Sequence, residues 1–244
     1  MIQGTVLHLF SWDKKFVLPF RDFIHEHFAD DKHQFIIYGD VVENDVPVSS
    51  DTRVMPSILK NIVAMTKTMN KADKIIIHGL FNNHLFYVLA MQPWLLKKCC
   101  WVIWGGDLYI HNAPVKDWRW KKDEFFRRSV IRRMGHLVTY IKGDYDLATE
   151  WYGARGQYHE CFMYPSNLYK DYAIPEVKHS SINILVGNSA DPSNNHLEVF
   201  DKLEVFKDQD IKIYAPLSYG NHAYAKKVIE EGKKQFGDKF KPLT

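Results

Sequence analysis

Short apolar runs that alternate with helical patterns constrain the fold of this chain most strongly. Lys74–Ile77, Cys99–Trp104 and Ile182–Val186 are runs of this kind, and a polar or small residue ends each of them before a helical pattern begins. Strands that are apolar throughout are typical of parallel sheets, because helices cover both faces of such sheets. The alternation predicts an α/β fold in which helices wrap parallel sheets.

A stretch without hydrophobic periodicity divides the chain into two parts. Residues 168–181 contain a proline and predict a linker between a Rossmann-like N-terminal domain at 1–167 and a C-terminal domain at 182–244. Two strand–helix units follow the linker. Two units cannot complete a doubly wound sheet, and domains usually hold roughly 100–150 residues. We therefore expect the second Rossmann-like domain to be incomplete, either because the chain is shortened or because the natural protein is a fragment.

Composition and charge exclude several classes of protein. The 244 residues are 46% hydrophobic and 25% charged, which is typical of a globular chain, and the net charge of +3 is too small to argue for nucleic acid. No run approaches the roughly 18 apolar residues of a membrane span. The N-terminus lacks the pattern of a signal peptide, and the three cysteines lack Cys-x-x-Cys spacing. We expect a reduced, cytoplasmic protein.

The stretch Ile184–Leu197, ILVGNSADPSNNHL, carries the strongest local signal for a ligand. An apolar strand ends at Gly187, small polar residues follow, and a helical pattern begins near Asn195. Such a corner presents free backbone N–H groups and the positive end of a helix dipole, which suit a phosphate. A capped turn without a ligand fits the spacing about equally well, because one glycine is weaker than a full Gly-x-Gly-x-x-Gly fingerprint.

Polar residues also follow the predicted strands of the N-terminal domain, where open parallel sheets bind ligands. They are Asp13, His78, Asn82 and Asp107. Asp107 follows two glycines and a very apolar strand, so its carboxyl could have a raised pKa and act as a base. The alternative is that Asp107 caps a helix or braces a loop. A lone histidine such as His78 is more often a hydrogen-bonded core residue than a catalyst.

No residue pattern predicts a metal ion or another cofactor. Asp144 and Asp146 resemble the Asp-x-Asp that holds a metal in one class of sugar transferase, but their place at a helix start favours capping. His25 and His27 lack the i,i+4 spacing of a zinc-binding helix. We therefore expect neither a metal nor a cofactor.

A basic and aromatic helix is predicted at 117–134. Within residues 116–133, eight lysines and arginines stand against three carboxylates. Trp118 lies at the start of the helix, and Arg127 and Arg128 flank an apolar stripe, so the helix could lie on an anionic membrane surface. The alternative is an ordinary packed helix with a solvated basic face. Nucleic acid is the least favoured partner, because no accompanying binding motif is present.

Four blocks of sequence occur in a characteristic order and spacing: IHGLFN (Ile77–Asn82), WVIWGGDLY (Trp101–Tyr109), ILVGNSADPSNNH (Ile184–His196) and APLSYGNHAY (Ala215–Tyr224). Together they resemble glycosyltransferase family 56. Its known members are the bacterial TDP-4-acetamido-4,6-dideoxygalactose (Fuc4NAc) transferases of enterobacterial common antigen synthesis, also labelled 4-alpha-L-fucosyltransferases.

The resemblance implies a two-domain GT-B fold without a metal at its active centre. It also implies a nucleotide-sugar donor, a TDP-sugar in known members, and a polyprenyl-diphosphate-linked saccharide acceptor at the cytoplasmic face of the bacterial inner membrane. Residues of the C-terminal domain would then face the donor: Gly187, Asn188, Ser189, Asn194, Tyr219, Asn221 and Tyr224. Asp107 and His78 would be candidate bases on the acceptor side. Other residues would face the acceptor or the membrane: Asp13, Asn82, Trp118, Arg127 and Arg128.

The chain departs from the family pattern in two places. The pattern continues past Thr244, and its PMGY turn is shortened here to PLSY-GN. We therefore expect this chain to bind donor weakly and to turn over little. A non-catalytic nucleotide-sugar or membrane-surface binding module is the competing interpretation.

Overall fold

The structure is a computed structural model, and it describes residues 4–28, 32–39, 46, 49–161, 171–173 and 180–244. The chain forms two compact units, Met1–Tyr169 and Lys170–Thr244. Each unit encloses a hydrophobic core of its own. Most of the predicted linker lies outside the described residues. The sequence also predicts a strand at 158–164, and the end of that range lies outside them as well.

The first unit is built on a seven-stranded sheet with the order β3-β2-β1-β4-β5-β6-β7, in which all pairs are parallel. The prediction of a parallel sheet is thus confirmed. The strand order reverses between β1 and β4, and open α/β sheets bind ligands beyond the carboxyl ends of strands at such a point. The strands are β1 (Thr5–Ser11), β2 (Lys32–Tyr38), β3 (Thr52–Met55), β4 (Lys74–His78), β5 (Cys99–Val102), β6 (His136–Thr139) and β7 (Gln157–Glu160).

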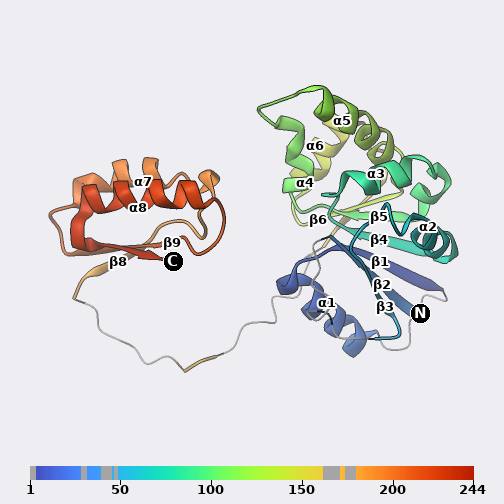
Figure 1. Cartoon of the computed structure of the whole chain (residues 1–244), viewed down its shortest axis with the longest axis horizontal. Helices are drawn as coiled ribbons and strands as arrows, with labels where there is room; N and C mark the ends of the chain where they lie inside the picture. The colour runs from blue at the N-terminus through green and yellow to red at the C-terminus, as the bar shows by residue number, and fades with distance from the viewer. Residues whose placement is uncertain (1–3, 29–31, 40–45, 47–48, 162–170, 174–179) are drawn as a thin grey trace. The chain divides into compact units, whose positions relative to one another are not determined.

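Helices cover the two faces of this sheet unequally (Figure 1). Successive strand residues point to opposite faces. In β1, Leu7 and Leu9 accordingly join the larger core, while Phe10 joins a smaller core beneath α1 (Lys14–His27). The remaining helices lie on the side of the larger core: α2 (Ile62–Lys71), α3 (Asn83–Ala90), α5 (Trp118–Ile131) and α6 (Lys142–Tyr152). The described part of the unit also contains shorter turns: η2 (Pro93–Lys98), α4 (Gly106–Tyr109) and η3 (Ile110–Asn112).

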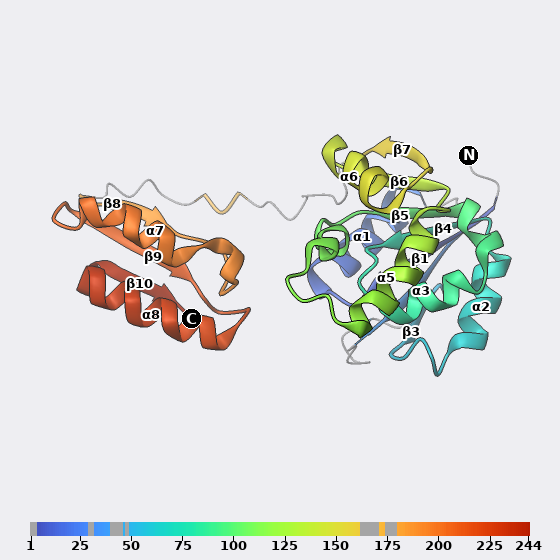
Figure 2. The ribbon, with the colours of Figure 1, turned by 90° about the horizontal axis from the view of Figure 1, so that it is seen from above.

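The second unit contains a three-stranded parallel sheet with the order β10-β9-β8. Two helices, α7 (His196–Leu203) and α8 (His222–Phe236), lie side by side along one face of it (Figures 1 and 2). Phe200 and Phe236 from these helices close the core against the sheet. The strands are β8 (Ile182–Leu185), β9 (Ile211–Pro216) and β10 (Phe240–Leu243), and the short turns are η4 (Pro192–Asn194), η5 (Glu204–Phe206) and η6 (Gly237–Lys239).

Two elements differ from their predicted form. The strand β10 is absent from the sequence prediction, because four residues that include Pro242 give too short a pattern to recognise. Pro56 and the apolar spacing of Ile58, Ile62 and Met65 predict a helix from Pro56 onward, whereas α2 begins only at Ile62. None of the described helices is long and apolar enough to cross a membrane.

Candidate active site

Asp107 ties together two loops at the carboxyl edge of the first sheet. Its side chain is 1% exposed and accepts hydrogen bonds from the backbone N–H of Leu80 at 2.8 Å, the indole N–H of Trp101 at 2.7 Å and the backbone N–H of Trp104 at 2.9 Å. Gly105, with φ of +86°, permits the sharp turn that brings the carboxylate back to the strand. This geometry shows the loop-bracing contact directly, whereas the role of Asp107 as a base stays a prediction.

The environment of Asp107 shifts its protonation in the direction that a base requires. Burial raises the pKa of Asp107, and the hydrogen bonds from Leu80, Trp101 and Trp104 act in the opposite direction. Tyr38, at the end of β2, is fully buried, and its pKa is raised first by burial and then by the charge of Asp107. Tyr38 is not among the predicted site residues, because a tyrosine at the end of an apolar strand gives no sequence signal beyond core packing.

His78 lies in a stack of imidazole and aromatic rings beneath α1. Its ring is 3.7 Å from the ring of Phe10, centroid to centroid, and its Nε2 is 3.0 Å from Nδ1 of His8. Burial, followed by the neighbouring His8, lowers the pKa of His78 well below its ordinary value, so the imidazole is neutral at pH 7. Asp13 follows β1, and its backbone carbonyl accepts hydrogen bonds from the N–H groups of Phe16 and Val17 at the start of α1. Asp13 and His78 therefore flank the point where the strand order reverses.

Asn82 and Trp118 line one surface cavity between α3 and α5. The side chain of Asn82 caps α3 by accepting from the backbone N–H of His84 at 2.9 Å. Trp118 is largely exposed at the start of α5. The cavity has a volume of about 460 Å³ and is lined by Phe81, Asn82, Asn83, His84, Tyr87, Trp118, Arg119, Lys122 and Asp123. The structure therefore brings two of the predicted acceptor-side residues together.

The two arginines named on α5 have different surroundings. The guanidinium of Arg127 is buried, lies 3.2 Å from a carboxylate oxygen of Glu124 and donates to Asn83. Arg128 has a side chain that is 48% exposed and lies 3.6 Å from the other oxygen of Glu124. The prediction that Arg127 belongs to the membrane-facing side of the helix is wrong, because its side chain is buried within the unit. Val130 and Met134 are buried in the larger core, so the apolar stripe packs inward.

Asp144 does not cap the helix at whose start it lies. Its carboxylate accepts a hydrogen bond of 2.6 Å from the hydroxyl of Tyr109, which raises the pKa of that tyrosine. The bond joins the segments that follow β5 and β6, at the same edge as Asp107. Tyr109 is not among the predicted site residues, because its partner Asp144 is 35 positions away in the sequence.

The stretch Ile184–Leu197 in the second unit forms the predicted sequence of strand, turn and helix start. Gly187 follows β8 with φ of +70°, and a Cβ atom there would lie 2.5 Å from Nε2 of His196. The amide of Asn194 donates to the carbonyl and the hydroxyl oxygens of Ser189, each at 3.1 Å. The predicted helix start near Asn195 is confirmed, because α7 begins at His196.

A second loop lies against this corner. The N–H of Ala190 donates to the carbonyl of Tyr219 at 2.8 Å, and the N–H of Asn221 donates to the carbonyl of Ala190 at 3.0 Å. The side chain of Asn221 caps α8 through the N–H of Tyr224, whose ring lies 5.7 Å from the ring of His196. All seven predicted donor-side residues therefore lie at the carboxyl edge of the second sheet, although the side chains of Asn194 and Asn221 are engaged within the loops.

His196 is a further residue of this edge that the sequence analysis did not single out. Its ring is fully buried beneath Gly187, and burial lowers its pKa. Among the described residues, no three histidine, cysteine, aspartate or glutamate side chains gather as a group that could hold a metal ion. Independence of metal stays a prediction.

Solved structures of other proteins share this α/β fold. A glycosyltransferase from Rickettsia africae ESF-5 matches 98% of this chain and 67% of its own with 13% identity and a TM-score of 0.59. UDP-N-acetylglucosamine 2-epimerase from Rickettsia bellii matches 98% of this chain and 68% of its own with 16% identity and a TM-score of 0.56. An apo structure of OtsA matches 98% of this chain and 73% of its own with 9% identity and a TM-score of 0.56. At such identities the likeness concerns the fold alone, and it confirms the predicted GT-B-like α/β class.

The family follows from the sequence rather than from these folds. Residues 9–242, nearly the whole chain, match the model of the family described as "4-alpha-L-fucosyltransferase glycosyl transferase group 56". The chain belongs to this family of glycosyltransferases, and the resemblance found in the four sequence blocks is confirmed.

Proposed function

We propose that this glycosyltransferase moves a fucose-like or Fuc4NAc-like deoxyamino sugar from a TDP-linked donor to a polyprenyl-diphosphate-linked saccharide. The family match over residues 9–242 is the observation that carries this proposal. The product would belong to a cell-surface polysaccharide of the enterobacterial common antigen type. The reaction would need no metal and would take place on the cytoplasmic face of the inner membrane, in an enzyme of the GT-B type.

The second unit supports the donor half of this proposal. Two helices, α7 and α8, begin at the edge that holds Gly187 and Asn188, and the first N–H groups of a helix attract a diphosphate. The exposed ring of Tyr219 lies beside this edge, on the loop that leads into α8. These groups would stabilise the nucleoside diphosphate as its bond to the anomeric carbon breaks.

The first unit supports the acceptor half. A carboxylate with a raised pKa, such as Asp107, would take the proton from the acceptor hydroxyl while the oxygen attacks the anomeric carbon. Because three hydrogen bonds already engage this carboxylate, it would act through the lone pairs that remain. The cavity beside Asn82 and Trp118, about 460 Å³ in volume, is large enough for a sugar ring of the acceptor.

The exposed face of α5 supports a peripheral position on the membrane. Arg128 on this helix and Arg132, its C-cap residue, are exposed, as are the aromatic side chains of Trp118 and Phe125. Basic side chains attract anionic lipids, and tryptophan favours the level of the lipid headgroups. The buried Arg127 takes no part in this surface.

A thermal-shift titration with TDP, UDP and GDP tests the donor. We expect TDP to raise the melting temperature most, because a ligand that binds only the folded state stabilises it, by about 2.7 kcal/mol at a concentration of 100 times Kd. Asn188→Ala should reduce the shift. Asn183→Ala, an exposed residue of β8, serves as the matched control and should retain it. A melting-temperature shift with UDP or GDP but not with TDP would overturn the assignment of TDP. The reaction itself is tested by an assay of sugar transfer from a TDP-sugar to a lipid-linked saccharide.

Cosedimentation with vesicles of phosphatidylcholine and phosphatidylglycerol tests the membrane surface. The double variant Arg128→Glu and Arg132→Glu should bind at least roughly tenfold more weakly, since each basic residue near the surface contributes about 1 kcal/mol. The control is Lys226→Glu with Lys227→Glu, which changes charge equally on exposed positions of α8. Equal binding by the two double variants would contradict a membrane role for α5.

A further inference from the structure

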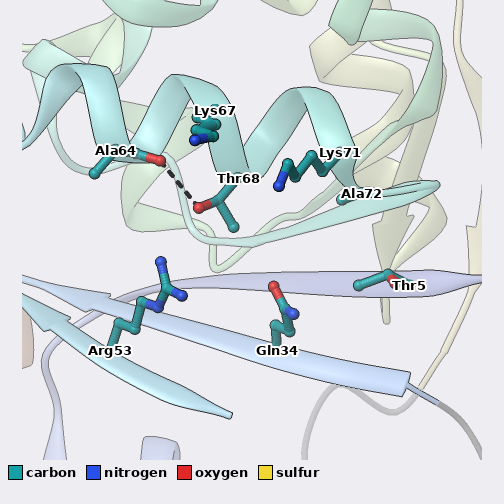
Figure 3. A pocket seen from close by; sticks show the side chains of 8 residues that line it. All are labelled: Thr5, Gln34, Arg53, Ala64, Lys67, Thr68, Lys71 and Ala72. Carbon is teal, nitrogen blue, oxygen red and sulfur yellow. Dashed lines mark hydrogen bonds between the residues drawn. The ribbon is translucent and has the colours of Figure 1, made fainter. Parts of the chain in front are cut away.

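A cavity between α2 and the first sheet lies apart from every residue proposed for sugar transfer. Its volume is about 370 Å³, and its lining comes from the starts of strands and from one face of α2: Thr5, Gln34, Arg53, Ala64, Lys67, Thr68, Lys71 and Ala72. Figure 3 shows Arg53 and Gln34 pointing from the strands toward the helix, and Lys71 pointing from the helix back toward the strands. Thr5 is the first residue of β1, so the cavity lies toward the amino edge of the sheet.

The strand side chains in this cavity lie on the same face of the sheet as the larger core, at its amino edge. Thr5, Gln34 and Arg53 each precede by two positions a buried member of the larger core, and they share its face of the sheet. Those members are Leu7, Ile36 and Met55. Gln34 pairs with Leu7, and Arg53 pairs with Ile36, so the polar positions adjoin the core directly. The sheet beneath α2 therefore changes from apolar to polar toward its amino edge.

The charge in this cavity has a single sign. Arg53, Lys67 and Lys71 are positive, and no carboxylate is among the described residues that line the cavity. Lys67 and Lys71 are four positions apart on α2, a spacing at which like charges destabilise a helix by about 0.2–0.5 kcal/mol. Asp73, the carboxylate that follows α2, accepts the backbone N–H of Thr5 at 2.7 Å. A concave surface lined by one sign of charge concentrates the positive potential inside it.

We propose that this cavity binds a phosphate group that carries at least two negative charges, at a site distinct from the sugar-transfer edge. Arg53 can present two parallel N–H donors to phosphate oxygens, and the lysines supply point charges. Gln34 adds an amide N–H donor from the sheet side. A volume of about 370 Å³ holds a pyrophosphate or the phosphorylated head of a larger molecule. The phosphate belongs either to a small soluble molecule or to the headgroup of a lipid.

Isothermal titration of the full chain with inorganic pyrophosphate tests the site. The double variant Arg53→Gln and Lys71→Gln should lose at least roughly tenfold in affinity, equivalent to about 1.4 kcal/mol. The control, Lys226→Gln with Lys227→Gln, removes the same charge from exposed positions of α8 and should bind as the wild type does. If the wild type and the Arg53 and Lys71 double variant bind pyrophosphate with equal affinity, the proposal is overturned. This holds even when binding is observed, because pyrophosphate would then bind elsewhere, for example at the Gly187 corner.

Cosedimentation with phosphatidylcholine vesicles that contain phosphatidic acid identifies the source of the phosphate. A lipid headgroup is the ligand if the Arg53 and Lys71 double variant binds these vesicles more weakly than the control variant does, and if pyrophosphate competes. A soluble phosphate is the ligand if vesicle binding stays equal while pyrophosphate binding is lost. Both results support the site. Melting temperatures within about one degree of the wild type confirm that the variants are folded.

Discussion

At the scale of single residues, Asp107 has two possible tasks that one substitution can separate. The carboxylate joins the loop after β4 to the loop after β5, and it is also the base proposed for the acceptor hydroxyl. A base acts only while substrate is present, whereas a brace stabilises the fold at all times. Measuring stability and sugar transfer on the same variant therefore assigns the residue.

Asp107→Asn should lower the free energy of unfolding by about 1–3 kcal/mol, because the new amide turns an N–H donor toward buried donors. Urea unfolding of the first unit measures this loss. Asp146→Asn, at an exposed carboxylate paired with Lys142, should change the stability by less than about 1 kcal/mol. If the stability of Asp107→Asn equals that of the wild type, the bracing role is contradicted. Only the proposed role of Asp107 as a base would then stand.

The buried histidines of the first unit should make its stability depend on pH. Burial, followed by the charge of His33, lowers the pKa of His8 from 6.5 to about 3. Below about pH 6.5, His8 becomes protonated in the unfolded chain but stays neutral in the folded chain. The free energy of unfolding is therefore highest above this pH and falls as the pH decreases. Between about pH 7.5 and about pH 5.5, His8 should cost about 1.4 kcal/mol, and urea unfolding at both values measures it.

His8→Phe tests the assignment of this pH dependence. The new ring can stack on Phe35, whose ring lies 4.8 Å from that of His8, and it cannot be protonated. The variant should therefore lose part of the decrease in stability at acidic pH. A decrease as large as that of the wild type would show that other groups cause it.

At the scale of elements, α5 combines a buried ion pair with an exposed basic face. Arg127→Gln should destabilise the first unit by about 3–5 kcal/mol, because Glu124 then keeps a buried charge with fewer partners. Arg128→Gln, one position later on the same helix, should cost less than about 1 kcal/mol. Thermal unfolding of both variants measures the difference, and equal losses would contradict the contrast in burial.

Periodicity predicted the elements better than it predicted individual contacts. Val130 on α5 and Met134 after the end of the helix are both buried, as the predicted apolar stripe indicated, and apolar runs indicated most strands. Spacing could not show that Arg127 points inward, because its partner Asn83 comes from another helix. The partners of Asp107 and Asp144 were likewise set by which strands lie side by side. Only the folded sheet brings those loops together.

At the scale of the whole molecule, the described residues of the two units share no hydrophobic cluster, and the units should therefore give two unfolding transitions. Phe200 is fully buried in the core of the second unit, and its removal should cost about 3–5 kcal/mol there. Phe200→Ala should therefore shift one calorimetric transition to lower temperature and leave the other unchanged. A single transition that moves as a whole would show that the units unfold together.

The position of β1 has a consequence for how the chain reaches its fold. β1 lies inside the sheet between β2 and β4 and is synthesised before both of these strands, and β4 begins only at Lys74. Its apolar residues cannot be enclosed until that later segment has left the ribosome, and parallel pairing over such separations is slow. We expect refolding of the first unit to be slow and prone to aggregation at high concentration. In the cell, a newly made chain would depend on chaperones during this interval.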